Sequence, residues 1–126
     1  MKIYLAGGLR KPWRRIIKVN ANYPDVKYLD PNEHERNIPS QYTNIDLHMI
    51  DNSDLVFGYI EEDNPGGYNT IFELGYAIGK GIPIIFINEK SDWDKYAGMI
   101  KESSLFYTDW FEEGIGFLNR YLRIIR

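Results

Sequence analysis

The fold is decided by residues 55–88, which read LVFGYIEEDNPGGYNTIFELGYAIGKGIPIIFIN. Residues 55–60 and 82–88 are nearly continuous apolar runs, as expected of parallel strands buried on both faces. Between them, residues 70–80 carry apolar side chains at helical spacing and end at Gly81. A strand, a helix and a second strand in this order predict a right-handed crossover between two parallel strands.

The same alternation of strands and helices continues on both sides of this unit. Further strands are predicted at residues 2–6, 26–30 and 105–108, further helices at residues 12–22, 40–52, 92–102 and 109–126, and a polar loop at residues 32–39. The buried sides of the first two helices are predicted to carry Trp13, Ile16 and Ile17, and Tyr42, Ile45 and Met49. The pattern predicts an α/β protein with a doubly wound, five-stranded parallel sheet, a flavodoxin-like or Rossmann-like three-layer sandwich.

Length and composition limit the class of protein. A chain of 126 residues predicts a single domain, residues 1–126, and its 44% hydrophobic content excludes a mainly disordered chain. The net charge of −3 argues against a nucleic-acid polymer as partner, because surfaces that bind one are normally basic. The longest apolar run, residues 82–87, is too short to span a membrane, and no signal peptide opens the chain. We therefore expect a cytoplasmic protein without a membrane partner.

Missing and scarce residue types narrow the possible chemistry. The chain has no cysteine, which excludes a disulfide framework, a thiolate nucleophile and a cysteine-bound metal. His34 and His48 lie on separate predicted elements without the spacing of a metal motif, so no metal is expected. Carboxylates therefore remain as the candidate catalytic groups.

Ligands of a doubly wound sheet bind at the carboxyl ends of its strands. In this chain that rule selects residues 7–10, 30–31, 61–73 and 88–89. Gly7 and Gly8 either form a tight strand-to-helix turn or, with Arg10, bring backbone N–H groups close to a sugar or a phosphate.

Glu73 stands out in an otherwise apolar predicted helix. Thr70 and Glu73 have the spacing of a capping box, which satisfies free N–H groups at a helix start. A carboxylate at a helix N-terminus that faces a crevice would also stay ionised and could act as a nucleophile. Spacing alone leaves both interpretations open.

Two further polar residues lie near this predicted crevice. Asp46 is on the predicted helix 40–52, whereas Asp51 and Asp54 lead into the next strand, and aspartates in such positions mostly cap helices or face solvent. Tyr4 is at the centre of the first strand, where a buried hydroxyl needs a hydrogen-bond partner. A carboxylate in the crevice would supply that partner.

Two longer runs carry a resemblance to a known family. Residues 45–59, IDLHMIDNSDLVFGY, and residues 72–83, FELGYAIGKGIP, resemble the nucleoside 2-deoxyribosyltransferase family. The superfamily of these enzymes includes the deoxynucleoside 5′-monophosphate N-glycosidases. Residues 3–10, 99–101 and 110–122 also look like parts of that family, so the resemblance covers nearly the whole chain.

The resemblance implies roles for five residues. Glu73 matches the family's nucleophile, which attacks the anomeric carbon and forms a covalent glycosyl-enzyme. Asp46 matches the aspartate that helps protonate the departing base, and Tyr4 matches the tyrosine that hydrogen-bonds the nucleophile. Gly7 and Arg10 match the loop beside the sugar 5′ position. The two acids then need different protonation states, with Glu73 ionised at its helix start and Asp46 desolvated enough to hold a proton.

Three positions depart from the family pattern. Gly67 stands where the transferases carry Asp and the monophosphate hydrolases Ser, and Asn69 stands where the family usually has Gly. Ala97 stands where those hydrolases place a phosphate-binding Ser. Tyr68 and Asn69 are therefore candidate substrate-binding residues, through a hydroxyl and an amide.

Two hypotheses about function follow. The first is an enzyme that cleaves the N-glycosidic bond of 2′-deoxynucleosides or deoxynucleotides, by hydrolysis or by transfer to a second base. The alternative is a non-catalytic nucleoside- or nucleotide-binding module of the same fold, which Gly67 and Ala97 motivate. A flavodoxin or a phosphoacceptor receiver is disfavoured, because the first loop lacks a Ser/Thr-rich phosphate cradle.

The resemblance also has implications for cofactors and partners. It implies a small-molecule nucleoside or nucleotide as substrate and no organic cofactor. It further implies a homodimer or a larger homo-oligomer, for which residues 40–52 and 93–100 are candidate contacts.

Overall fold

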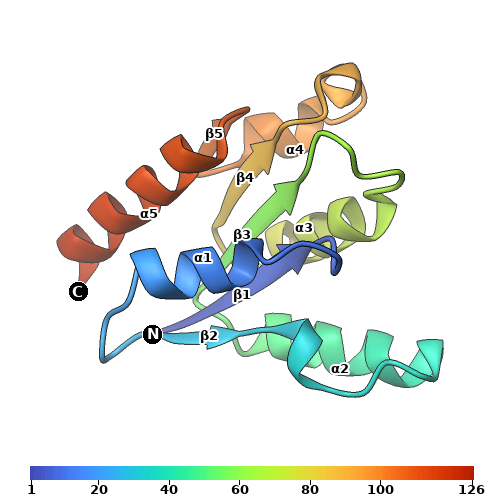
Figure 1. Ribbon diagram of the computed structural model, residues 1–126, viewed down its shortest axis with the longest axis horizontal. Helices are drawn as coiled ribbons and strands as arrows, with labels where there is room; N and C mark the ends of the chain where they lie inside the picture. Colours follow the sequence, from blue (N-terminus) through green and yellow to red (C-terminus); the bar gives the residue numbers. More distant parts are fainter.

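A five-stranded, all-parallel sheet forms the centre of the protein, with the strand order β2-β1-β3-β4-β5 (Figure 1). The computed structural model describes residues 1–126, the side chain of Ser91 apart. The strands are β1 (Lys2–Gly7), β2 (Lys27–Leu29), β3 (Leu55–Ile60), β4 (Ile84–Asn88) and β5 (Phe106–Thr108). The helices are α1 (Trp13–Asn20), α2 (Pro39–Asp51), α3 (Tyr68–Gly79), α4 (Gly98–Ser103) and α5 (Phe111–Ile125), with 3₁₀ turns at Pro31–Glu33 and Ser91–Trp93.

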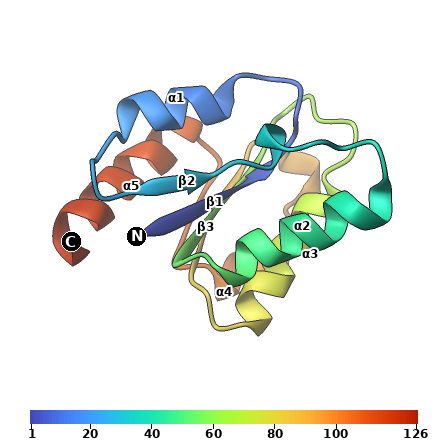
Figure 2. The same cartoon turned by 90° about the horizontal axis from the view of Figure 1, so that it is seen from below.

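Helices cover both faces of the sheet, α1 and α5 on one face and α2, α3 and α4 on the other (Figures 1 and 2). Alternate residues of each strand point to opposite faces, so β1 sends Ile3 and Leu5 under α1 and α5 and sends Tyr4 and Ala6 under the other layer. Each residue of β3 and β4 is buried, which explains why these strands read as continuous apolar runs. The predicted doubly wound α/β fold is confirmed.

The strand order reverses beside β1. The chain passes from β1 to the edge strand β2 and then returns to β3 on the opposite side of β1. The connections that leave β1 and β3 therefore turn to opposite faces of the sheet, and a crevice opens between them at the carboxyl ends of these two strands.

The predicted single helix over residues 92–102 is correct only from Gly98 onward. A 3₁₀ turn at Ser91–Trp93 and a separate helix α4 from Gly98 occupy this stretch instead. The break follows from the side chain of Asp94, whose Oδ1 accepts hydrogen bonds from the Tyr107 hydroxyl at 2.6 Å and from Asn88 Nδ2 at 3.4 Å. These bonds hold residue 94 against the ends of β4 and β5, so the chain turns before α4 begins.

The predicted buried sides of two helices need correction. Ile16 of α1 and Ile45 of α2 are exposed, at 42% and 43%. Polar residues occupy buried positions close to them in the sequence, Arg14 in α1 and Asp46 in α2. Both polar side chains find partners inside the fold, which hydropathy cannot reveal, and those partners belong to the functional site described below.

Of the described helices, none combines the length and the apolar character that crossing a bilayer requires.

We predict that Gly114→Ala destabilises the protein by about 1–3 kcal/mol, because the added methyl group overpacks the contact between α5 and β4. A Cβ at residue 114 would lie 2.2 Å from Ile87 Cδ1 and 2.8 Å from its Cγ1. Gly116→Ala, two residues along the same helix, is the control: its Cβ would meet only the far end of Arg120, at 3.5 Å. Urea unfolding should give that control an unchanged free energy of unfolding, or one higher by up to about 1 kcal/mol. Equal effects of the two substitutions would contradict the packing argument.

Candidate active site

A cavity of about 500 Å³ opens at the carboxyl ends of β1 and β3, where the strand order reverses. One side of its wall comes from α2 and the loop after β2, and the other side from the loops after β1 and β3 and the first turns of α3. The lining residues that the argument below uses are Tyr4, Gly7, Gly8, Arg36, Asp46, Asn64, Tyr68, Asn69 and Glu73. The structure therefore brings together most of the residues selected from the sequence.

Tyr4 and Glu73 form the centre of this cavity. The Tyr4 hydroxyl, on buried β1, donates a hydrogen bond to Oε2 of Glu73, on α3. Desolvation is the main reason why the pKa of Glu73 is raised, to about 7, and the nearby Asp46 carboxylate raises it further. The Tyr4 hydrogen bond and the cations of Arg14 and Arg36 act in the opposite direction. Burial and the Glu73 carboxylate both raise the pKa of Tyr4, so the phenol remains a donor.

The capping-box interpretation of Thr70 and Glu73 is wrong, and Glu73 does not lie at the helix start from which its ionised state was expected. Helix α3 begins at Tyr68, two residues before the predicted start, and Gly67 precedes it. No described side chain caps the N-terminus of this helix. Thr70 is the third residue of the helix and is buried. Glu73 therefore lies in the second turn, where it loses hydration in the cavity instead of being held ionised by free N–H groups.

Asp46 is buried opposite, on α2, with two partners that local patterns do not indicate. Its Oδ1 lies 2.8 Å from His34 Nε2 and its Oδ2 accepts a hydrogen bond from Arg36 Nη2 at 3.0 Å. The guanidinium of Arg36 also stacks on the ring of Tyr42, 4.4 Å from its centroid. Both oxygens of Asp46 thus face donors. From the sequence, desolvation was expected to keep a proton on Asp46. That expectation did not include the ion pair with Arg36.

Both ring nitrogens of His34 have a polar partner. Nε2 faces the Asp46 carboxylate, and Nδ1 lies 3.0 Å from the backbone oxygen of Glu35. Nδ1 can only donate to that backbone oxygen, whereas Nε2 either donates to the Asp46 carboxylate or accepts a hydrogen bond from the protonated acid. One signal in the sequence pointed here: the polar loop of residues 32–39 directly follows the carboxyl end of β2, where the doubly wound fold places ligands.

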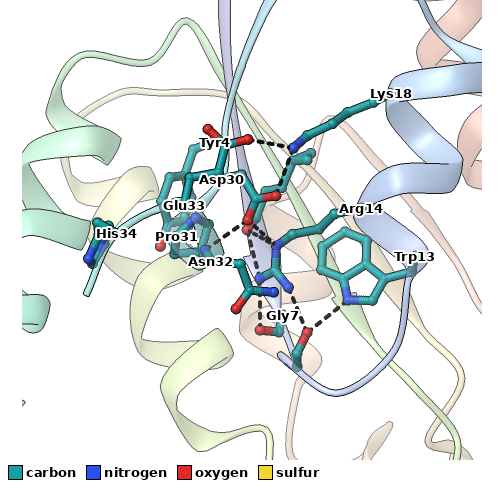
Figure 3. Close-up of polar contacts among 12 residues, drawn as sticks. Tyr4, Gly7, Trp13, Arg14, Lys18, Asp30, Pro31, Asn32, Glu33 and His34 are labelled. Carbon is teal, nitrogen blue, oxygen red and sulfur yellow. Dashed lines mark hydrogen bonds and ion pairs between the residues drawn. The ribbon is translucent and has the colours of Figure 1, made fainter. Parts of the chain in front are cut away.

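Arg14 holds the loop after β1 from behind (Figure 3). Its buried guanidinium donates hydrogen bonds to the backbone oxygens of Leu5, Gly7 and Gly8 and forms an ion pair with Asp30, with Nε 3.3 Å from Oδ1. The ammonium of Lys18 bridges Asp30 and Glu33, at 2.8 Å from each. Trp13 Nε1 adds a fourth donor, 2.9 Å from the Gly8 oxygen. Nothing in the local sequence indicates that Arg14 is buried.

The other residues predicted to bind the substrate differ in whether they line the cavity. Gly7, Tyr68 and Asn69 line the cavity, whereas Arg10 is exposed and lies outside the set of lining residues. Tyr68 is 75% exposed and its ring packs against Trp93, with 5.0 Å between the centroids.

Two of the departures from the family pattern have structural reasons. Gly67 has φ +107°, and a Cβ there would lie 3.3 Å from the Trp93 ring, so the backbone and Trp93 together favour glycine. Ala97 is buried in the core between the sheet and its helices, and it is not one of the residues that line the cavity.

Comparison with known proteins adds an independent finding. A family model described as "Nucleoside 2-deoxyribosyltransferase like" matches residues 1–91. The 2-deoxyribosyltransferase of Bacillus psychrosaccharolyticus has a similar structure, with a TM-score of 0.69, 22% identity and coverage of 90% of this chain and 89% of the other. The 2-desoxiribosyltransferase from Leishmania mexicana gives a TM-score of 0.71, 18% identity and coverage of 95% and 97%. At these identities the likeness shows the fold alone, and no curated protein matches the chain.

We predict that Glu73→Gln stabilises the protein at neutral pH, by about 1–3 kcal/mol, because the substitution removes a desolvated acid. The pKa of Glu73 is raised from 4.5 to about 7, so the unfolded state releases its proton at lower pH than the folded state does. The free energy of unfolding of the unsubstituted protein should therefore fall, relative to that of Glu73→Gln, as the pH rises from about 4.5 to 7.

Urea unfolding at pH 4, 6 and 8 checks this prediction. Glu62→Gln, at an exposed glutamate, should show no such trend. A difference between Glu73→Gln and the unsubstituted protein that does not change with pH would contradict the raised pKa.

Proposed function

The chain belongs to the nucleoside 2-deoxyribosyltransferase-like family, and from this premise we propose that it cleaves the N-glycosidic bond of 2′-deoxynucleosides or deoxynucleotides. One observation carries the proposal: a single cavity holds Glu73, hydrogen-bonded by Tyr4, opposite Asp46 with its partners His34 and Arg36. Cleavage of a glycosidic bond with retention uses one acid as nucleophile and another group to protonate the leaving group. The two acids here have the contrasting environments that such a division of roles requires.

Glu73 is the proposed nucleophile. Its carboxylate oxygen attacks C1′ of the sugar, and the bond between C1′ and the base nitrogen breaks with its electron pair going to the base. The product is a glycosyl ester of Glu73. A nitrogen of a second base or a water molecule then attacks C1′ and releases the carboxylate, which gives transfer or hydrolysis. The hydrogen bond from Tyr4 orients the carboxyl group toward one face of the sugar.

The departing base takes its proton from the opposite half of the cavity. Asp46 lines this half, and its Oδ1 is 2.8 Å from Nε2 of His34. A doubly protonated His34 can pass a proton to the Asp46 carboxylate, which then donates it to the base nitrogen. Arg36 holds the other oxygen of Asp46 at 3.0 Å, which fixes the orientation of the carboxyl group.

Exposed apolar side chains near the mouth of the cavity support a homo-oligomer as part of the proposal. Phe72 on α3 lines the cavity and is 57% exposed, and Ile45 on α2 is also exposed. Helices α2 and α3 lie side by side on one face of the sheet (Figure 2). A second copy placed on this face would bury both side chains and narrow the mouth of the cavity.

A non-catalytic binding module is the second candidate function. The observation that favours it is that Gly67 and Ala97 offer no polar side chain at positions where the resemblance places substrate contacts. The two candidates differ in one measurable property, because a binding module holds the nucleoside without releasing its base.

We predict that the protein releases free base from at least one member of a panel of 2′-deoxynucleosides and their 5′-monophosphates. Glu73→Ala should lower the rate by at least about 10³-fold, since no nucleophile remains. Asp46→Asn should lower it by about 10²–10⁴-fold, since the base loses its route to a proton. Chromatography of free base, with and without a second base, measures the rates and separates transfer from hydrolysis.

Glu62→Gln is the control for the substitutions in that experiment and should retain full activity. Binding of a nucleoside without base release would favour the second candidate function. Release that survives Glu73→Ala would contradict the proposed nucleophile.

We predict that kcat/KM falls as the pH is lowered through about 7, because attack requires the Glu73 carboxylate and the pKa of this group is about 7. The hydrogen bond from Tyr4 lowers that pKa, so Tyr4→Phe should move the midpoint of the profile to higher pH. Initial rates between pH 5 and 9 check both statements. A midpoint near the ordinary glutamate value, or one that Tyr4→Phe leaves in place, would contradict them.

A further inference from the structure

The loop that carries His34 and Arg36 has little backbone support. In the part of the chain that the structure describes, no backbone–backbone hydrogen bond involves the four residues that begin with His34. The side chains of His34 and Arg36 hold the inner side of the loop through Asp46. Arg36 Nη1 also donates a hydrogen bond to the backbone oxygen of Pro31 at 3.0 Å. The positions of both side chains therefore depend on what fixes the Pro31–Glu33 turn.

Lys18, in the last turn of α1, fixes that turn from outside the cavity (Figure 3). Its Nζ lies 2.8 Å from Oδ2 of Asp30 and 2.8 Å from Oε1 of Glu33. Asp30 directly precedes the turn and caps it, because its Oδ1 accepts a hydrogen bond from the Asn32 N–H at 2.8 Å. Glu33 is the last residue of the turn. One ammonium group therefore ties both ends of the turn to α1.

The contact between Lys18 and Asp30 differs from an ordinary surface ion pair. The two side chains are 32% and 8% exposed, and Asp30 is also paired with the buried Arg14. Partial burial lowers the pKa of Lys18, but the hydrogen bonds to Asp30 and Glu33 outweigh this effect and raise the pKa, so the ammonium stays charged. A lysine in the last turn also suits the helix dipole. The dipole does not explain why two carboxylates gather around this lysine.

Helix α1 thus supports two walls of the cavity through separate side chains. Arg14 donates hydrogen bonds to backbone oxygens at the end of β1, including those of Gly7 and Gly8. Lys18, one turn later on the same helix, binds the turn after β2. Because Arg14 keeps its own partners when Lys18 is changed, the support of the loop after β2 can be tested by itself.

We propose that Lys18 is a positioning residue for protonation of the departing base, an inference that rests on the proposed function. Lys18 is not among the residues that line the cavity. Its ammonium holds the turn so that His34 and Arg36 reach Asp46 and keep this carboxyl group oriented toward the base. Attack by Glu73, from α3, uses none of these contacts. Loss of the ammonium therefore slows the step that delivers the proton and spares the attack on C1′.

The first test compares a purine 2′-deoxynucleoside with its N7-methylated form. The methylated base already carries a positive charge, so it leaves as a neutral molecule without taking a proton. We expect Lys18→Met to lower kcat for the unmodified compound by about 3- to 30-fold and to leave kcat for the methylated compound within about twofold. Lys18→Arg keeps the charge and should restore most of the lost rate. Lys11→Met, which breaks the exposed ion pair with Asp63, is the matched control and should change neither rate.

The second test needs no activity, because the chain has two histidines whose ring signals can be followed by NMR. We expect the signals of His34 to move in Lys18→Met and to stay in place in Lys11→Met. His48 is exposed on α2, away from the turn, and hydrogen-bonds with Asn52. Its signals should stay in place in both variants. Thermal unfolding confirms that each variant is folded before its signals and rates are compared.

Each result has a distinct meaning. Equal slowing of the two compounds by Lys18→Met indicates a general structural role and overturns the inference. Signals of His34 that Lys18→Met leaves in place overturn it as well. Absence of base release from every compound overturns the proposed function, whereas a selective shift of the His34 signals then still supports the role of Lys18 in holding the loop. Where the methylated compound is not cleaved, the His34 signals decide.

Discussion

The guanidinium group of Arg14 connects the fold of this protein to its cavity. Arg14 extends from α1 to the end of β1, where it donates hydrogen bonds to the backbone oxygens of Leu5, Gly7 and Gly8 and forms an ion pair with Asp30. A buried cation is stable only when its donors are matched, and removal of one partner from such a pair destabilises a protein by about 3–5 kcal/mol. The position of the Gly7–Gly8 loop, and thus of one cavity wall, depends on this cluster.

Two acids, Glu73 and Asp46, face the cavity that Arg14 helps to shape, and they have different hydrogen-bond partners. Glu73 has one neutral donor, the Tyr4 phenol, and desolvation raises its pKa to about 7. Asp46 has a guanidinium and an imidazole as partners. A group with a pKa near 7 can be a carboxylate at neutral pH while it remains poorly hydrated, which favours attack on carbon. The acid that was expected to carry a proton is instead the one with the cationic partner.

The sequence predicted the parts of the structure that depend on apolar patterns. β3 and β4 were found because both faces of each strand are buried, and the crevice followed from the order of strands and helices. Tyr4 was matched to a crevice carboxylate because a buried hydroxyl needs an acceptor. Arg14 and His34 were missed because long-range polar partners determine their positions, and no local periodicity records such partners. The same limit explains the helix break at Asp94, which depends on contacts with Asn88 and Tyr107.

The unfavourable features of this protein gather at one end of the sheet. Glu61 is buried with an unpaired oxygen, Glu73 is desolvated, and Gly67 has a backbone conformation that other residues rarely adopt. The sheet interior differs from this end, because the cores on its two faces consist of packed apolar side chains. A fold with burial on both faces can tolerate a few unfavourable groups at its edge, because the stabilisation comes from elsewhere. Local conflicts that gather at one end of the sheet, and that differ in chemistry from one another, are better explained by selection for a ligand than by imperfect packing.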